Sequence, residues 1–175
     1  GEHGLFNKGF NFYEETMRIP FAAKLPFGIK GLVNNHFISL VDICPTILEY
    51  AGTEKISPAH GISLMSLLKG DNSENWRNAA FAQFHGYETT LYTQRMLRTE
   101  KFKYCYNPAD IDELYDLEND PAELHNLIED EAFKGTLEKM RDMLFLEMKS
   151  LGESCIETCA YGIGINRRIT GVWED

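Results

Sequence analysis

Between residues 78 and 152 the chain changes from short strand-like runs to one long amphipathic segment, and this order restricts the fold more than any other feature. The runs are rich in aromatic and β-branched residues and cover 80–84, 92–98, 102–106 and 114–117. Short runs of alternating character predict antiparallel strands. The turn at 118–121 closes the last run. These residues therefore predict a small antiparallel sheet.

A long helix is predicted after the sheet. Apolar residues recur there at steps of three and four, and charged residues occupy the positions between them. The apolar positions are Phe133, Leu137, Met140, Leu144, Met148 and Leu151, and Gly152 follows where a helix commonly ends. Because one side of this helix is apolar, we expect it to cover the sheet.

The residues before the sheet predict a buried strand followed by two helical segments. An apolar run bounded by prolines at 19–26 suits a buried strand better than a helix. Asp42 is placed to cap a helix that continues to Gly52. A second short amphipathic segment follows at 63–68.

The polar loop at 70–73 is the best internal boundary. We expect a domain portion over 1–72, a subdomain of sheet and helix over 73–152, and an irregular tail over 153–175. With 175 residues, of which 43% are hydrophobic, the chain is long enough to bury a core.

The charge of the chain argues against two classes of partner. A formal net charge of -10 disfavours nucleic acid and anionic membrane surfaces, because both attract a basic face. No apolar run approaches the roughly 20 residues that span a bilayer. We therefore expect neither a nucleic-acid nor a membrane partner, and the cellular compartment stays open.

The four cysteines do not form the framework of a small disulfide-rich protein, because they are few and scattered. Cys155 and Cys159 would share one side of a helix, so they could pair or bind a metal. No His or Cys beside them completes a zinc site. Free thiols are the favoured interpretation.

Glycines surround His3 and Lys8 in the opening segment, and they let backbone approach a ligand closely. Taken alone, Lys8 could be an ordinary surface lysine, and His3 is no more specific. The segment has the character of a site loop with no strand before it, so we expect the chain to be part of a longer protein. The chemistry of the loop has to be judged from the wider pattern.

The wider pattern resembles the sulfatases. In the first half, the residues that carry the resemblance read GEHGLFNKG at 1–9, YEETMRIP at 13–20 and VDICPTILEYAG at 41–52. In the second half, QRMLRTEKFKY at 94–104 and DELYDLENDPAELHNL at 112–127 are similar to the C-terminal subdomain of the same family. One such piece is a weak signal, but their shared order is a strong one. The resemblance covers residues 1 to about 130.

The resemblance implies an α/β fold, in which the C-terminal part of an alkaline-phosphatase-like α/β domain precedes the small antiparallel sheet and its helix. It also implies a parent enzyme that hydrolyses sulfate monoesters. The family's lysine equivalent to Lys8 contacts the sulfate, so Lys8 is the candidate catalytic residue. His3 is expected to line the substrate pocket or to brace the loop, and His85 to contact the organic part of the substrate.

The same resemblance implies two cofactors, a formylglycine nucleophile and calcium. Calcium and lysines neutralise the sulfuryl oxygens while the nucleophile attacks sulfur. The metal ligands are expected before Gly1, and neither Cys44 nor Cys105 begins the Cys/Ser-x-Pro/Ala-x-Arg motif that yields formylglycine. We therefore expect this chain to bind no metal, to be inactive alone, and to need the missing N-terminal half of the catalytic domain. Apolar surface left exposed over 1–72 would favour self-association.

Two other functions stay open. Similar loops and a matching lysine serve phosphoryl substrates in the same superfamily, so the parent could be a phosphonate monoester or phosphodiester hydrolase. The chain could also be a docking or oligomerisation module that kept the fold without the chemistry. For a sulfatase, the substrate is a sulfated small molecule or sugar whose organic group the sequence does not identify.

Overall fold

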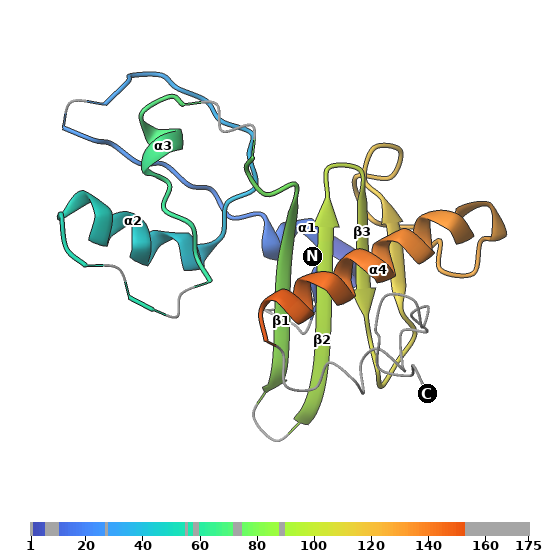
Figure 1. Ribbon diagram of the computed structural model, residues 1–175. Coiled ribbons are helices and arrows are strands. Elements are labelled where there is room, and N and C mark those ends of the chain that lie inside the picture. Colours follow the sequence, from blue (N-terminus) through green and yellow to red (C-terminus); the bar gives the residue numbers. More distant parts are fainter. Residues whose placement is uncertain are drawn as a thin grey trace. The chain divides into compact units, whose positions relative to one another are not determined.

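The structure is a computed structural model (Figure 1), and it describes residues 2–5, 11–26, 28–54, 56–57, 60–71, 75–87 and 90–152. The chain divides into two compact units. The first, called here the sheet unit, combines Gly1–Ile19 with Phe81–Asp175, and the second, called the helical unit, is Pro20–Ala80. The domain boundary expected near residue 72 stays a prediction.

The sheet has four strands in the order β1-β2-β3-β4, which is also their order in the chain (Figure 1). Their bounds are Ala79–Tyr87 for β1, Thr90–Thr99 for β2, Phe102–Tyr106 for β3 and Glu113–Asp116 for β4. The pairs β2/β3 and β3/β4 are antiparallel, with Met96 opposite Cys105 and Tyr104 opposite Leu114. The prediction of a small antiparallel sheet is therefore confirmed.

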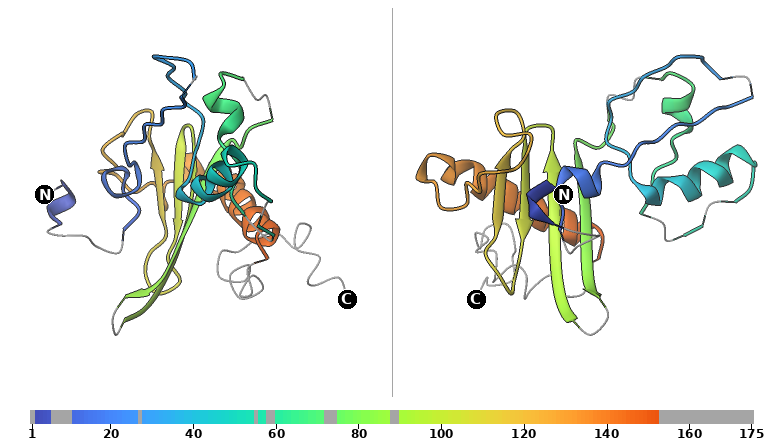
Figure 2. Two further views of the ribbon diagram at one scale, coloured as in Figure 1. Left: turned by 90° about the vertical axis from the view of Figure 1, so that its left-hand side faces the viewer. Right: turned by 180° about the vertical axis from the view of Figure 1, so that it is seen from behind.

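Helix α4, Lys134–Ser150, covers one face of this sheet and packs against β2 and β3 (Figure 2). A short turn of 3-10 helix, Glu131–Phe133, precedes it. The buried residues of α4 are Leu137, Met140, Leu144, Phe145 and Met148. They are largely the apolar positions expected from the sequence. Gly152 follows the helix with a φ of 69°, a conformation that glycine adopts without strain. The predicted covering helix is confirmed.

The opposite face of the sheet is covered by the beginning of the chain. Residues 11–17 include the short helix α1, Glu14–Met17, which lies on the other side of the sheet from α4 (Figure 2). Phe12 packs there with Met96 and Cys105, and the partly buried Met17 and Phe84 complete this contact. The opening segment is thereby attached to the C-terminal sheet, far from it in sequence.

The helical unit contains η2, Leu40–Asp42, α2, Ile43–Tyr50, and α3, Met65–Leu68. The buried strand expected at 19–26 is wrong, because the described residues of that run form no strand. Ile19 is 52% exposed and Phe21 is 45% exposed. Pro20 and Pro26 have no N–H to donate to a neighbouring strand, which explains why apolar character alone does not make a strand here.

Asp42 stands at the start of α2, as the sequence predicts, but its side chain does not cap the helix. The carboxylate is fully buried and accepts hydrogen bonds from Ser39 N at 2.7 Å and from Ile62 N at 2.8 Å. Arg77 Nη2 donates to it at 2.6 Å. Asp42 therefore forms a capping box with Ser39 at the start of η2, and it also joins this helix start to the segments that contain Ile62 and Arg77.

Gly61 is expected to tolerate no side chain. A Cβ at this position would overlap the carbonyl oxygen of Val41, a backbone atom that cannot turn aside. Gly61→Ala should lower the free energy of unfolding by about 1–3 kcal/mol, the usual range for overpacking. Urea denaturation of the 175-residue chain measures it.

Gly135→Ala is the matched control for this prediction. Gly135 lies in α4 with open space where a Cβ would stand, so the same change should raise stability by about 0.5–1 kcal/mol. Equal effects at the two glycines would contradict the steric argument.

Candidate functional site

Of the predicted site residues, Lys8 lies outside the described residues, while His3 and His85 lie within them. His3 is part of the short turn η1, Glu2–Gly4, and has a φ of 56°. A positive φ is uncommon for a residue with a side chain, although histidine adopts it more readily than most. Backbone strain of this kind is concentrated at functional sites.

The His3 ring is stacked on the ring of Tyr13. Their centroids are 3.6 Å apart and the planes are inclined by only 5°. Nε2 of His3 lies 4.0 Å from a carboxylate oxygen of Glu15, and the His3 side chain is 12% exposed. The imidazole is therefore held by Tyr13 and Glu15.

Tyr13 in turn contacts the sheet through Tyr115 of β4. The two rings are 6.1 Å apart and tilted by 57°. Burial raises the pKa of Tyr115, and the nearby Glu113 carboxylate raises it further. Burial also raises the pKa of Glu113. The sheet thus supplies a partly buried polar row beneath the stacked pair.

A cluster of charges, formed by Lys103, Glu14 and Glu123, lies beside this row and is called here the Lys103 cluster. Lys103 Nζ lies 2.8 Å from Glu14 Oε1 and 2.7 Å from Glu123 Oε1. The Lys103 and Glu123 side chains have no exposed surface, and Glu14 is 17% exposed. Arg98 adds a second, longer contact to Glu14 at 3.3 Å. Three segments of the sheet unit meet at this cluster.

The charges also bind the backbone around Tyr13. Lys103 Nζ donates to the carbonyl oxygen of Phe12 at 2.7 Å, and Glu14 N donates to Glu123 Oε2 at 2.7 Å. Burial acts to raise the pKa of Glu14, but the charges of Lys103 and Arg98 outweigh it and hold that pKa below its usual value. Glu14 is therefore an ionised partner of Lys103 at neutral pH.

His85 is placed differently. It lies in β1 next to Phe84, which packs with Phe12 and Met96, so strand alternation puts the imidazole on the other face of the sheet. Its Nδ1 lies 3.0 Å from Thr93 Oγ1, and Arg95 Nη1 donates to the same hydroxyl at 2.7 Å. The structure does not bring His85 onto the face that carries the stacked His3.

Sequence reasoning did not find Lys103 or Glu123. One signal was available: residues 102–106 alternate, and this alternation puts Lys103 on the same face as the buried Cys105. A lysine at an inward position of a strand needs a buried carboxylate. Nothing local identifies Glu123, which follows the turn after β4 and reaches Lys103 only in the folded chain.

The described ranges hold no group of three His, Cys, Asp or Glu side chains arranged to bind a metal ion. They do not fit a calcium site, so no metal-dependent step is assigned to them. Cys44 and Cys105 are free thiols, and Cys155 and Cys159 lie outside the described residues. None of the described helices is long and apolar enough to cross a membrane.

Comparison with known proteins adds to this geometry. Residues 1–150 match the family described as N-sulphoglucosamine sulphohydrolase, C-terminal. An N-acetylglucosamine-6-O-sulfatase of Bacteroides thetaiotaomicron is 38% identical over 134 residues, which are 73% of this chain and 24% of that protein. The family match over residues 1–150 includes both the opening segment and the sheet with its helix.

Two solved structures share the fold. BT4656, in complex with its substrate D-glucosamine-2-N,6-O-disulfate, is 28% identical with a TM-score of 0.59, over 65% of this chain and 24% of that one. The phosphonate monoester hydrolase of Agrobacterium radiobacter is 27% identical with a TM-score of 0.59, over 66% of this chain and 26% of that one. The chain spans about a quarter of the length of these proteins. It belongs to the N-sulphoglucosamine sulphohydrolase C-terminal family and has the mixed α/β fold of the C-terminal portion of alkaline-phosphatase-like sulfatases.

Proposed function

We propose that this chain is the C-terminal portion of a sulfatase whose full-length form hydrolyses sulfate monoesters, with a sulfated sugar as the favoured class of substrate. One observation carries the proposal: a single family match runs from the His3 segment through the sheet to α4. The names of two similar proteins point to sulfated glucosamine, since one is an N-acetylglucosamine-6-O-sulfatase and the other binds a glucosamine disulfate.

Within this proposal, Lys8 is the residue that contacts the sulfate. Its ammonium group is a compact charge on a flexible stem, suited to an oxyanion whose negative charge shifts during sulfur–oxygen cleavage. His3 lines the substrate pocket or braces the loop, and its stack on Tyr13 is compatible with either role. His85 is proposed to contact the organic part of a substrate, although in the structure it shares no face with His3.

The formylglycine nucleophile and calcium belong to the parent enzyme in this proposal. They would be held by the N-terminal half of the catalytic domain, which is the main partner that we propose for this chain. The helical unit offers surface for such a contact, because no residue of α2 is buried and Ile47 and Tyr50 are 60% and 56% exposed. The same apolar residues would support self-association of the isolated chain.

A phosphonate monoester hydrolase is the second candidate, and the likeness to the Agrobacterium radiobacter enzyme is the observation that favours it. Both reactions need cations around a tetrahedral oxyanion, so the fold does not distinguish them. A non-catalytic docking module is the third candidate. The rates of hydrolysis of sulfate and phosphonate esters therefore have to distinguish the three candidates.

Kinetics of the full-length protein test the proposal. We expect kcat/KM for glucosamine 6-sulfate or an aryl sulfate to exceed that for a phenyl phosphonate ester by at least about tenfold, which corresponds to 1.4 kcal/mol in the transition state. The 175-residue chain alone should turn over neither ester. The reverse preference would favour the phosphonate hydrolase, and no turnover of either ester by the full-length protein would favour the docking module.

A further inference from the structure

Tyr13, the residue on which His3 stacks, lies between two residues whose backbones are bound by buried charges. Lys103 binds the carbonyl oxygen of Phe12 before it, and Glu123 binds the N–H of Glu14 after it. A shift of this segment by one residue would break both hydrogen bonds. The place of the Tyr13 ring, and of the His3 ring on it, therefore depends on the Lys103 cluster.

Two residues of this network, His3 and Glu123, have strained backbones. In the part of the chain that the structure describes, His3 and Glu123 are the non-glycine residues with positive φ, at 56° and 53°. A left-handed conformation is unfavourable for a residue with a side chain. Such strain persists only where the surroundings hold it. For Glu123, one carboxylate oxygen lies 2.7 Å from Lys103 Nζ in an ion pair, and the other accepts a hydrogen bond from Glu14 N.

Stability alone does not account for the cluster. Buried ion pairs can often be replaced by apolar residues of similar volume with no loss of stability. Apolar packing is already present nearby, between Phe12, Met96 and Cys105. Charged hydrogen bonds to the backbone add direction and register, which apolar contacts do not supply.

We infer that Lys103, Glu14 and Glu123 are positioning residues that hold the His3–Tyr13 pair in register with the sheet. The catalytic consequence rests on the proposed function. The positioning itself concerns only the geometry of His3 and Tyr13. In this inference the three charged residues act through the opening segment and do not touch the substrate.

The test is a double variant, Lys103→Met with Glu123→Leu, studied in the full 175-residue chain. It removes one charge of each sign and leaves Glu14 with Arg98 as its partner. The readout is the NMR signal of the His3 ring protons, which stacking on Tyr13 shifts upfield and which is assigned by its loss in His3→Gln. We expect this shift to disappear, while the methyl signals of Leu144 and Met148, on the buried side of α4, stay dispersed as in the native chain.

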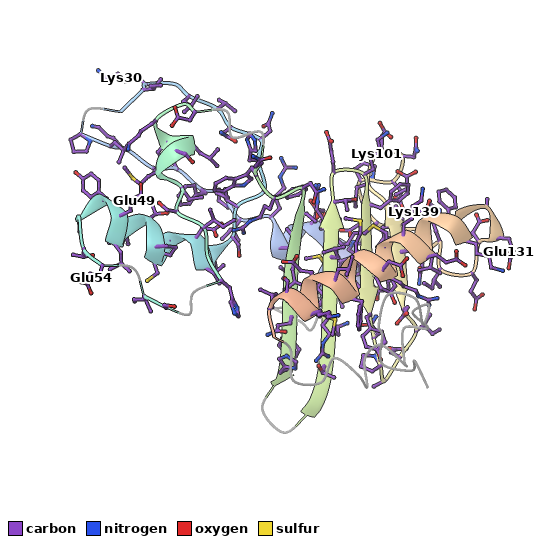
Figure 3. The ribbon with its side chains drawn as sticks, viewed as in Figure 1. Lys30, Glu49, Glu54, Lys101, Glu131 and Lys139 are labelled. Atoms are coloured by element: carbon purple, nitrogen blue, oxygen red, sulfur yellow. The ribbon has the colours of Figure 1, made fainter. Side chains whose placement is uncertain are left out.

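The matched control is Lys101→Met with Glu118→Leu. Lys101 lies in the turn between β2 and β3 (Figure 3). Its Nζ is 2.8 Å from Glu118 Oε2, and both side chains are about 60% exposed. We expect the His3 signal to be unchanged. In the full-length enzyme, kcat/KM should fall by roughly 100-fold in the cluster variant, the size of effect produced by displacing a site by about 1 Å, and stay near the native value in the control.

A folded cluster variant whose His3 ring protons keep the native shift would overturn the inference. If the double variant does not fold, Glu123→Gln replaces it, because an amide oxygen still accepts from Glu14 N while the charge facing Lys103 is lost. That variant should lose part of the upfield shift, and an unchanged shift would again overturn the inference. If the native full-length protein cleaves no sulfate ester, the proposed function is wrong. The NMR result still tests whether the Lys103 cluster positions His3 and Tyr13.

Discussion

Replacing Asp42 by alanine should destabilise the helical unit by about 3–5 kcal/mol, the cost of removing one partner from a buried ion pair. The Asp42 carboxylate is fully buried and is bound by Arg77 and by two backbone N–H groups. In the variant, Ser39 N and Ile62 N lose their acceptor and Arg77 loses its anion. Urea denaturation at neutral pH, followed through Trp76 fluorescence within the same unit, measures the change.

Glu49→Ala is the matched control for Asp42→Ala. Glu49 is an exposed residue of α2 (Figure 3), so the change removes the same charge from the same region without breaking a buried network. We expect its effect to stay within about 0.5 kcal/mol. An Asp42→Ala variant as stable as Glu49→Ala would show that the buried carboxylate does not join the segments of this unit.

Replacing Lys8 by alanine should lower kcat of the full-length enzyme by about 100- to 1000-fold, the loss typical of removing one group that stabilises an oxyanion in the transition state. The proposed function requires this cation at the sulfate. Lys8→Arg should recover part of the loss, because the charge is kept while its position changes. Thermal unfolding of the variants shows whether the fold is retained.

Lys30→Ala is the control for the charge itself. Lys30, like Lys8, precedes a glycine in the sequence. Lys30 lies in an exposed turn (Figure 3). We expect native kcat in this variant. If Lys8→Ala and Lys30→Ala gave the same kcat, Lys8 would be an ordinary surface lysine, and the assignment of the opening segment to the sulfate site would be lost.

Local periodicity was enough to predict most of the sheet unit. The four strand runs follow from the alternation of apolar and polar residues, and the helix after residue 133 follows from apolar residues spaced by three and four. Both spacings indicate which side of the element is buried. The buried strand predicted at 19–26 is wrong. The run is apolar without being paired, because prolines remove N–H donors from both ends of the run.

The candidate site could be predicted only in part. Glycine-rich surroundings and the resemblance predict His3 and Lys8 as site residues. The place of Asp42 before a helix predicts it as a helix cap. The partners of these residues were not predictable. Tyr13 beneath His3, and Arg77 beside Asp42, are contacts that only the folded chain creates.

The sequence by itself determined which segments become strands and helices in the sheet unit, and which family the opening loop resembles. Both depend on short spacings that the chain carries wherever it folds. Only the tertiary structure decided that residues 12–14 bind to Lys103 and Glu123, which are 91 and 109 residues away from Phe12 and Glu14 respectively. The reason is physical: a buried charge is tolerated only with a partner, and three-dimensional packing, not spacing along the chain, determines which residue that partner is.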